Sequence, residues 1–331
     1  MKYLFTSLLA CALALTACKS ESDTKIEDNK EPEKKALTIN PDGTFFKISL
    51  AQWSLHKPIE AGTLSPMDFA KTAKELGFDG IEYVSSMYVP EIKKYNNMDL
   101  AYQNILLPLK LKSEQYGVEN LIIMVDNEGD LASSDPQEIA RAIANHSMWI
   151  DVAEYLGCHS VRVNLFGNDD NQANWRAQAT SSLRRLSVYA QQKKINIIVE
   201  NHGGFSSYAA LLGKTIANVR QPNCGTLPDF GNFCLEREGG ARWGAPCVEE
   251  YDKYQGVKEL MPYAKAVSAK SYAFDAEGNE TTIDYVKMLQ IVKDAGYDGY
   301  IGVEFEGDAE DPTAGIQATK DLLIKAAKEV K

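Results

Sequence analysis

Residues 195–204 combine the pattern of a buried strand with side chains that can carry chemistry. Apolar, mostly β-branched residues fill the first positions, as in a buried parallel strand, and Glu200 and His202 follow, before two glycines. A carboxylate at the end of a buried strand is costly unless a cation or a hydrogen bond meets it. The pattern repeats near the end of the chain, where an apolar run precedes Glu304 and Glu306. We therefore predict that both strands deliver a glutamate to one site.

Strand-like segments alternate with amphipathic helical segments along most of the chain. The expected strands are residues 46–53, 79–84, 118–126, 160–166, 195–200, 224–232, 266–272 and 298–305. The expected helices are residues 65–76, 99–116, 135–156, 172–193, 206–219, 251–263, 282–295 and 312–330, with a long loop at 233–249. Eight strand–helix units predict a single (β/α)8 TIM barrel over residues 45–331. A doubly wound open sheet is the alternative, but the glycine-rich turn that normally follows its first strand is missing.

The carboxyl ends of the strands of such a barrel meet at one mouth, where its chemistry takes place. The polar residues at these ends are, in strand order, His56, Glu82, Asp126, Asn164, Glu200 with His202, Asp229, Lys270, and Glu304 with Glu306. So many carboxylates repel one another unless a divalent cation neutralises them or some keep their protons. The chain has 4 histidines, and oxygen-rich ligands favour Mg²⁺, Mn²⁺ or Ca²⁺ over a nitrogen-rich zinc site.

Several segments resemble the sugar phosphate isomerase/epimerase family with its xylose isomerase-like TIM barrel. The resemblance rests on Glu200 after Ile-Ile-Val, Asp229 after the sixth strand, Gly-Phe-Asp-Gly-Ile-Glu82 and Gly-Tyr-Ile-Gly-Val-Glu304, and it covers nearly all of residues 45–330. It implies one divalent metal (Mn, Mg or Zn), held by Glu, Asp, His and Glu at the ends of strands five to eight. Carried over to this chain, the metal ligands are Glu200, Asp229 and Glu304.

Two positions depart from the family pattern. Ser268 stands where the strand-seven histidine is expected, and Asn232 stands where a further histidine often follows the aspartate by three residues. His202 is then a candidate for a replacement ligand or for a substrate contact.

The resemblance implies a proton-transfer reaction on a small carbohydrate or related polyol. The metal would bind two oxygens of an α-hydroxycarbonyl sugar and stabilise the enediolate that deprotonation forms. Glu200 and Glu304 are the expected catalytic carboxylates that remove and return the proton, assisted by Lys270 or His202. The expected substrate contacts are His56, Glu82, Asn164 and Trp53.

Other interpretations remain open. Eliminating a leaving group from the same intermediate would make the protein a lyase or dehydratase acting on a keto-sugar or glycoside. A third interpretation is a catalytically inactive carbohydrate-binding barrel. Glu200 and Glu304 would then be structural residues, salt-bridged to Arg162 or Lys270, and His202 would cap a helix. A DNA-repair endonuclease on the same barrel is disfavoured, because that chemistry uses a histidine-rich zinc site.

The N-terminus and the overall charge indicate where the protein works. Residues 1–18 have a charged start, a short apolar run and a lipobox-like Leu-Thr-Ala-Cys end, which predicts a lipoprotein signal with lipidation at Cys18. The polar residues 19–44 are expected to form a disordered tether. We expect an extracytoplasmic protein, lipid-anchored in a bacterium, in which Cys234 and Cys247 form a disulfide. The net charge of -11 argues against a nucleic-acid partner. The oligomeric state is not predicted.

Overall fold

Eight parallel strands form the central sheet of the protein, in the order β6-β5-β4-β3-β2-β1-β10-β9. They are β1 (Lys47–Ala51), β2 (Gly80–Val84), β3 (Glu119–Val125), β4 (Ser160–Val163), β5 (Asn196–Glu200), β6 (Cys224–Leu227), β9 (Val267–Ser271) and β10 (Tyr300–Phe305). Each strand lies within one of the segments predicted from the sequence, so the pattern of apolar runs identified all of them.

The edge strands β6 and β9 meet and close the sheet into a barrel. Parallel bridges pair Thr226 with Ala264 and Asp229 with Ser268. The Ser268 amide donates a hydrogen bond to the Pro228 carbonyl at 2.9 Å. Closure therefore sets Asp229 and Ser268 side by side, and the predicted (β/α)8 architecture is confirmed.

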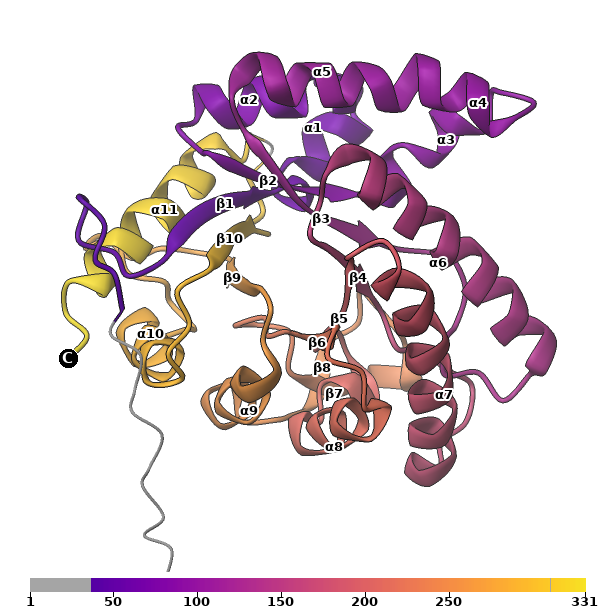
Figure 1. The fold of residues 1–331 in the computed structure, drawn as a ribbon. Helices are drawn as coiled ribbons and strands as arrows, with labels where there is room; N and C mark the ends of the chain where they lie inside the picture. The colour runs from indigo at the N-terminus through magenta and orange to yellow at the C-terminus, as the bar shows by residue number, and fades with distance from the viewer. Residues whose placement is uncertain (1–36, 310) are drawn as a thin grey trace, which may run out of the picture. The chain divides into compact units, whose positions relative to one another are not determined.

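Helices follow the strands along the chain and lie outside the ring that the strands form (Figure 1). The α-helices are α1 (His56–Glu60), α2 (Phe69–Glu75), α3 (Val89–Ile92), α4 (Met98–Ala101), α5 (Leu107–Tyr116), α6 (Pro136–Leu156), α7 (Gln172–Gln191), α8 (Ala209–Val219), α9 (Lys253–Leu260), α10 (Tyr285–Asp294) and α11 (Thr313–Ala327). The 3-10 helices are η1 (Gln52–Leu55), η2 (Pro66–Asp68), η3 (Ser85–Met87), η5 (Gly204–Ser206), η6 (Glu238–Gly240) and η7 (Met261–Tyr263), and η4 (Tyr102–Leu106) is a π-helix.

Helix α6 shows how local sequence sets the ends of these elements. The Asp135 carboxylate caps the helix by accepting a hydrogen bond from the Gln137 amide at 2.9 Å, and proline occupies the first helical position. The helix ends at Gly157, whose φ of 83° favours glycine. The buried side chains Trp149 and Ile150 of this helix belong to the main hydrophobic core of the barrel.

This computed structural model describes residues 37–309 and 311–331. The predicted signal, the lipidation site Cys18 and most of the tether lie outside the described residues. The end of the tether, 37–44, is ordered, because Asn40 Nδ2 donates to the Phe46 carbonyl at 2.7 Å and Thr44 is buried. The folded unit therefore begins before Phe45, the predicted boundary. Among the described residues, no helix is both long and apolar enough to cross a membrane.

The predicted loop 233–249 contains an antiparallel hairpin, which corrects that prediction. Its strands are β7 (Cys234–Arg237) and β8 (Cys247–Glu250), and the predicted disulfide between Cys234 and Cys247 joins them. Strand β8 is exposed along its whole length, so it carries no alternation of apolar and polar residues. We call residues 234–250 the stapled hairpin.

Candidate active site

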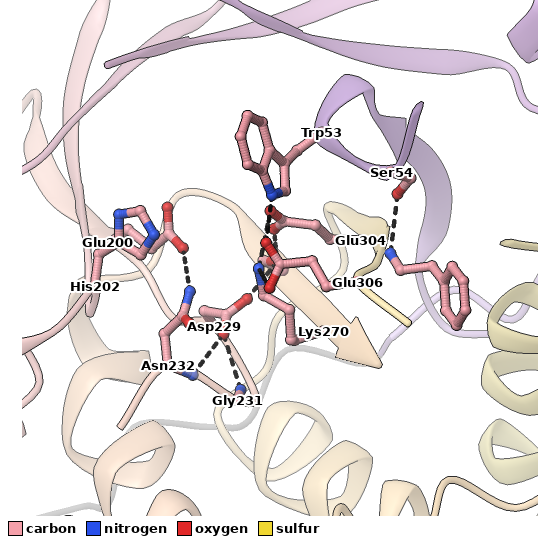
Figure 2. Close-up of polar contacts among 12 residues, drawn as sticks. Trp53, Ser54, Glu200, His202, Asp229, Gly231, Asn232, Lys270, Glu304 and Glu306 are labelled. Atoms are coloured by element: carbon pink, nitrogen blue, oxygen red, sulfur yellow. Dashed lines mark hydrogen bonds and ion pairs between the residues drawn. The ribbon is translucent and has the colours of Figure 1, made fainter. Parts of the chain in front are cut away.

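Glu200, Asp229 and Glu304 converge at the carboxyl end of the barrel. One carboxylate oxygen from each lies within 4.8 Å of the others, and the three residues are 1%, 0% and 4% exposed. Glu200 is the last residue of β5, Asp229 follows β6 by two residues, and Glu304 is the last residue but one of β10. Figure 2 shows the three side chains gathered at the same end of the strands. We call them the acidic triad.

Ser268 and Asn232, the two positions where the family pattern would have histidines, hold the acidic triad together. Ser268 Oγ lies 2.6 Å from Asp229 Oδ2 and 2.8 Å from Glu304 Oε2. Asp229 Oδ1 accepts hydrogen bonds from the backbone amides of Gly231 and Asn232, both at 2.8 Å. The Asn232 side chain donates to Glu200 Oε1 at 2.9 Å. Hydrogen bonds thus fix each carboxylate in place.

Lys270 on β9 supplies a buried positive charge beside the triad. Its Nζ lies 2.9 Å from Glu304 Oε1 and 3.3 Å from Glu306 Oε2. Its side chain is 1% exposed, and it keeps its charge because burial, which lowers the pKa of Lys270, is outweighed by Glu304 and Glu306. One of the salt bridges considered from the sequence is therefore present.

Arg162 on β4 supplies a second buried positive charge, on the other side of the triad. Its Nε lies 2.9 Å from Glu200 Oε2, but the angle is not that of a hydrogen bond, and both atoms lack a hydrogen-bond partner among the described residues. Arg162 Nη1 donates to Asp126 Oδ1 at 2.6 Å. Although burial favours the neutral acid, Arg162 and His202 hold the pKa of Asp126 below its usual value.

Burial dominates the electrostatics of the triad. It raises the pKa of Glu200 to about 7, against Arg162 and Lys270, and that of Asp229 to about 8, against Lys270 and the Ser268 hydrogen bond. Burial also acts to raise the pKa of Glu304, but the adjacent Lys270 outweighs it and lowers that pKa. Burial therefore favours the protonated forms of Glu200 and Asp229 near neutral pH, whereas Lys270 keeps Glu304 ionised.

A chain of hydrogen bonds fixes the protonation of His202. Asn164 Nδ2 donates to Asp126 Oδ1 at 2.8 Å, so the amide oxygen of Asn164 faces His202 Nδ1, also at 2.8 Å. That oxygen only accepts, so we assign the ring proton to Nδ1, which leaves Nε2 as an acceptor. Burial lowers the pKa of His202 to about 4, and the ring is neutral at pH 7. The ring of His202 thus bonds to Asn164 and does not cap a helix.

A cavity of about 870 Å³ lies beside the triad, whose three residues do not themselves line it. Its deep end includes Arg162 and Asn232, which contact Glu200, and Glu306, which contacts Lys270. The predicted substrate contacts Asn164 and Trp53 and the predicted catalytic residue His202 line its walls. Trp53 donates its indole N–H to Glu306 (Figure 2).

His56 and Glu82, also predicted to contact the substrate, lie elsewhere. The His56 ring stacks on Trp53 with 4.5 Å between ring centroids, behind the cavity wall. Glu82 accepts a hydrogen bond from Ser49 Oγ at 2.6 Å inside the barrel, beside Gly302, where any side chain would collide with its carboxylate. Burial raises the pKa of Glu82 to about 7. Neither residue lines the cavity, and their role as substrate contacts stays a prediction.

The donor set of the acidic triad can bind a divalent metal. Its carboxylate oxygens are ligands that Mg²⁺ and Mn²⁺ prefer. Glu200 Oε2 is buried without a hydrogen-bond partner among the described residues, and its one charged neighbour there is Arg162 Nε at 2.9 Å. Together with Asp126 and Glu306 the site has five carboxylates, and within the part of the chain that the structure describes their ion pairs are with Arg162 and Lys270. A bound divalent cation would add positive charge that the site lacks.

Sequence reasoning did not assign three residues that shape this site. Arg162 was considered only as a structural salt-bridge partner, and Ser268 and Asn232 only as replacements for histidine. Their place at strand ends was a usable signal, since every inward-facing polar residue there meets the same mouth.

Comparisons with known proteins agree with this architecture. Residues 70–326 match the family described as xylose isomerase-like TIM barrel. A search of curated proteins gave no match.

Three similar solved structures illustrate the fold. D-allulose 3-epimerase from Methylomonas sp. has a TM-score of 0.64 at 16% identity, covering 85% of this chain and 98% of its own. The 3-keto-D-glucoside 4-epimerase from E. coli has a TM-score of 0.59 at 15% identity, covering 78% and 94%. A xylose isomerase-like TIM barrel protein from Mycobacterium smegmatis, in complex with magnesium, has a TM-score of 0.58 at 16% identity, covering 86% and 97%. At such identities the likeness shows the fold alone. The family match extends over most of the barrel, and the chain belongs to the xylose isomerase-like TIM barrel family.

Proposed function

We propose that this protein is a sugar isomerase or epimerase that moves a proton on a carbohydrate held in the cavity beside the acidic triad. The observation that carries the proposal is the convergence of three buried carboxylates next to a cavity, which reaches their contact partners Arg162, Asn232 and Glu306. The epimerases among the similar structures support it. Solved structures of D-psicose 3-epimerase with D-tagatose and with D-fructose provide examples of the substrate class.

Different residues would remove the proton, return it and hold the sugar. Glu304, held ionised by Lys270, is suited to remove a proton from a sugar carbon. Glu200, whose pKa burial raises to about 7, is suited to return one. The neutral His202 ring can accept a hydrogen bond from a sugar hydroxyl through Nε2.

A divalent cation bound by the triad would polarise the carbonyl of the sugar and stabilise the negative charge that deprotonation develops. Glu200, Asp229 and Glu304 are the residues proposed to hold it. Ser268 supplies a hydroxyl at the place of the usual histidine, so the cation would have only oxygen ligands from these four residues.

We also propose that the enzyme works outside the cytoplasm, attached to a membrane through a lipid on Cys18. The lipobox-like sequence before Cys18 supports this location. The disulfide of the stapled hairpin is consistent with an oxidising compartment.

A carbohydrate-binding protein without catalysis is the second candidate. Two observations favour it. Ser268 stands at the place of the expected histidine, and the two triad glutamates form ion pairs with the side chains of Arg162 and Lys270. The two functions differ in one measurable property, because only an enzyme exchanges a carbon-bound hydrogen with solvent.

Deuterium incorporation from D₂O tests the proposed function. The purified protein is incubated with D-fructose, D-tagatose, D-psicose and a 3-keto-glucoside, with and without Mn²⁺ or Mg²⁺, and exchange is followed by NMR. We expect exchange in at least one sugar, with a loss of about 100-fold or more in Glu200→Gln and Glu304→Gln. Glu114→Gln, on the exposed face of α5, is the matched control. Full exchange in both site variants would refute the two-carboxylate mechanism, and binding without exchange in any sugar would favour the second candidate.

A further inference from the structure

The cavity beside the triad extends well beyond the reach of one sugar ring. Its volume of about 870 Å³ is near the upper end of the roughly 300–1,000 Å³ that pockets for drug-sized ligands occupy. The deep end carries the polar groups that contact the triad. The outer end is lined by Phe166, Arg242 and Trp243, which have no part in the proposed proton transfer.

Trp243 is the most prominent residue of this outer end. It lies between the two strands of the stapled hairpin and is 46% exposed, although it lines the cavity. Its ring centroid lies 4.6 Å from that of His202 and 5.4 Å from that of Phe166. A half-exposed indole that lines a cavity offers an apolar face to a ligand, and the C–H face of a sugar ring is a good partner for it.

The stapled hairpin holds Trp243 in place before any ligand arrives. Arg242 makes a two-pronged ion pair with Asp130, at 2.9 Å and 3.2 Å, and its guanidinium lies 4.3 Å from the Phe166 ring centroid. The disulfide joins the two strands of the hairpin. Gly244, with a φ of 77°, turns the chain directly after the indole. A side chain that is already positioned loses little entropy on binding.

We propose that the outer end of the cavity is a second sugar subsite and that the substrate is a glycoside of at least two rings, with the second ring stacked on Trp243. The inference rests on the proposed function, since the first ring is the one placed beside the triad. Arg237 and Asp130 border the same outer region and offer hydrogen-bonding groups for the hydroxyls of the second ring. The subsite selects disaccharides and other glycosides over free monosaccharides.

Paired binding measurements test this subsite. Calorimetry compares cellobiose, maltose and trehalose with D-glucose, lactose with D-galactose, and sucrose with D-fructose. We expect at least one disaccharide to bind about tenfold more tightly than its monosaccharide, because a second ring buries further apolar surface. Trp243→Ala should weaken disaccharide binding about tenfold more than monosaccharide binding, whereas Trp243→Phe should keep part of the advantage.

A matched control lies on the same hairpin. Val248→Ala alters a 60% exposed side chain of β8 that does not line the cavity, and should leave every Kd unchanged. Melting temperatures of all variants confirm that they are folded. The subsite is overturned if no disaccharide binds more tightly than its monosaccharide, or if Trp243→Ala weakens both equally. Deuterium exchange reports separately on the proposed function: tight disaccharide binding without exchange would retain the subsite and remove the isomerase.

Discussion

Lys270 offers the sharpest test of how the acidic triad is stabilised. Its Nζ lies 2.9 Å from Glu304 and 3.3 Å from Glu306, and its side chain is 1% exposed. Methionine fills a similar volume without charge, so Lys270→Met would leave the Glu304 carboxylate buried without its cation. Removing one partner of a buried ion pair typically costs about 3–5 kcal/mol. At roughly 2 °C per kcal/mol for a domain of this size, the melting temperature should fall by about 6–10 °C.

A double-mutant cycle separates this electrostatic effect from packing. Glu304→Gln removes the charge that Lys270→Met leaves unpaired, so the double variant should recover much of the lost stability. We expect a coupling energy of about 2 kcal/mol or more between the two positions. The assay is thermal unfolding of the wild type, both single variants and the double variant at pH 7 in EDTA.

The same variants report on metal binding. If a divalent cation binds the triad, it supplies the charge that Lys270→Met removes, so Mn²⁺ should raise the melting temperature of this variant more than that of the wild type. A fall of less than 2 °C in Lys270→Met, or strictly additive effects in the cycle, would refute the view that Lys270 neutralises Glu304.

Two further predictions concern pH and the hairpin. Burial lowers the pKa of His146 to about 4 from 6.5, so the unfolded chain binds more protons than the folded one between these pH values. The contribution of His146 to the free energy of unfolding is therefore fully present above pH 6.5 and is lost as the pH falls towards 4. The loss amounts to up to about 3 kcal/mol. His146→Leu should flatten the dependence of the melting temperature on pH in this range, and an unchanged slope would contradict the assignment. Reducing the disulfide between Cys234 and Cys247, 13 residues apart, should destabilise the hairpin by up to about 3 kcal/mol. Disaccharide binding in dithiothreitol should weaken more than monosaccharide binding, and equal weakening would show that the disulfide does not position Trp243.

The barrel could be predicted from the sequence because the pattern of each strand is contained in a short stretch of the chain. Each strand of the barrel lies within a strand-like segment of the sequence, and the residue that follows or ends it is fixed by chain order alone. Once eight such strands close into a ring, their carboxyl ends share one mouth. Glu200, Asp229 and Glu304 were therefore brought together correctly, although more than 100 residues separate the first from the last.

The sequence could not predict how deep in the barrel a carboxylate lies or which way its side chain points. Glu82 and Glu304 both lie on barrel strands, yet one is bound to Ser49 inside the barrel while the other is paired with Lys270 at the mouth. The environment that a strand carboxylate enters depends on its neighbours in the folded barrel, and residue types do not encode it. The stapled hairpin escaped prediction because β8 has no buried face, and its stability comes from the disulfide.

Ser268 allows Asp229 to keep a proton beside the ionised Glu304. Its hydroxyl has one hydrogen but lies within hydrogen-bonding distance of both Asp229 and Glu304. If it donates to Glu304, its contact with Asp229 is favourable when Asp229 carries a proton, in agreement with the pKa of about 8 that burial gives Asp229. A proton or a divalent cation can therefore balance the same excess of negative charge. Metal content and deuterium exchange must be measured on the same sample, because exchange in metal-free protein would show that the proton alone suffices for catalysis.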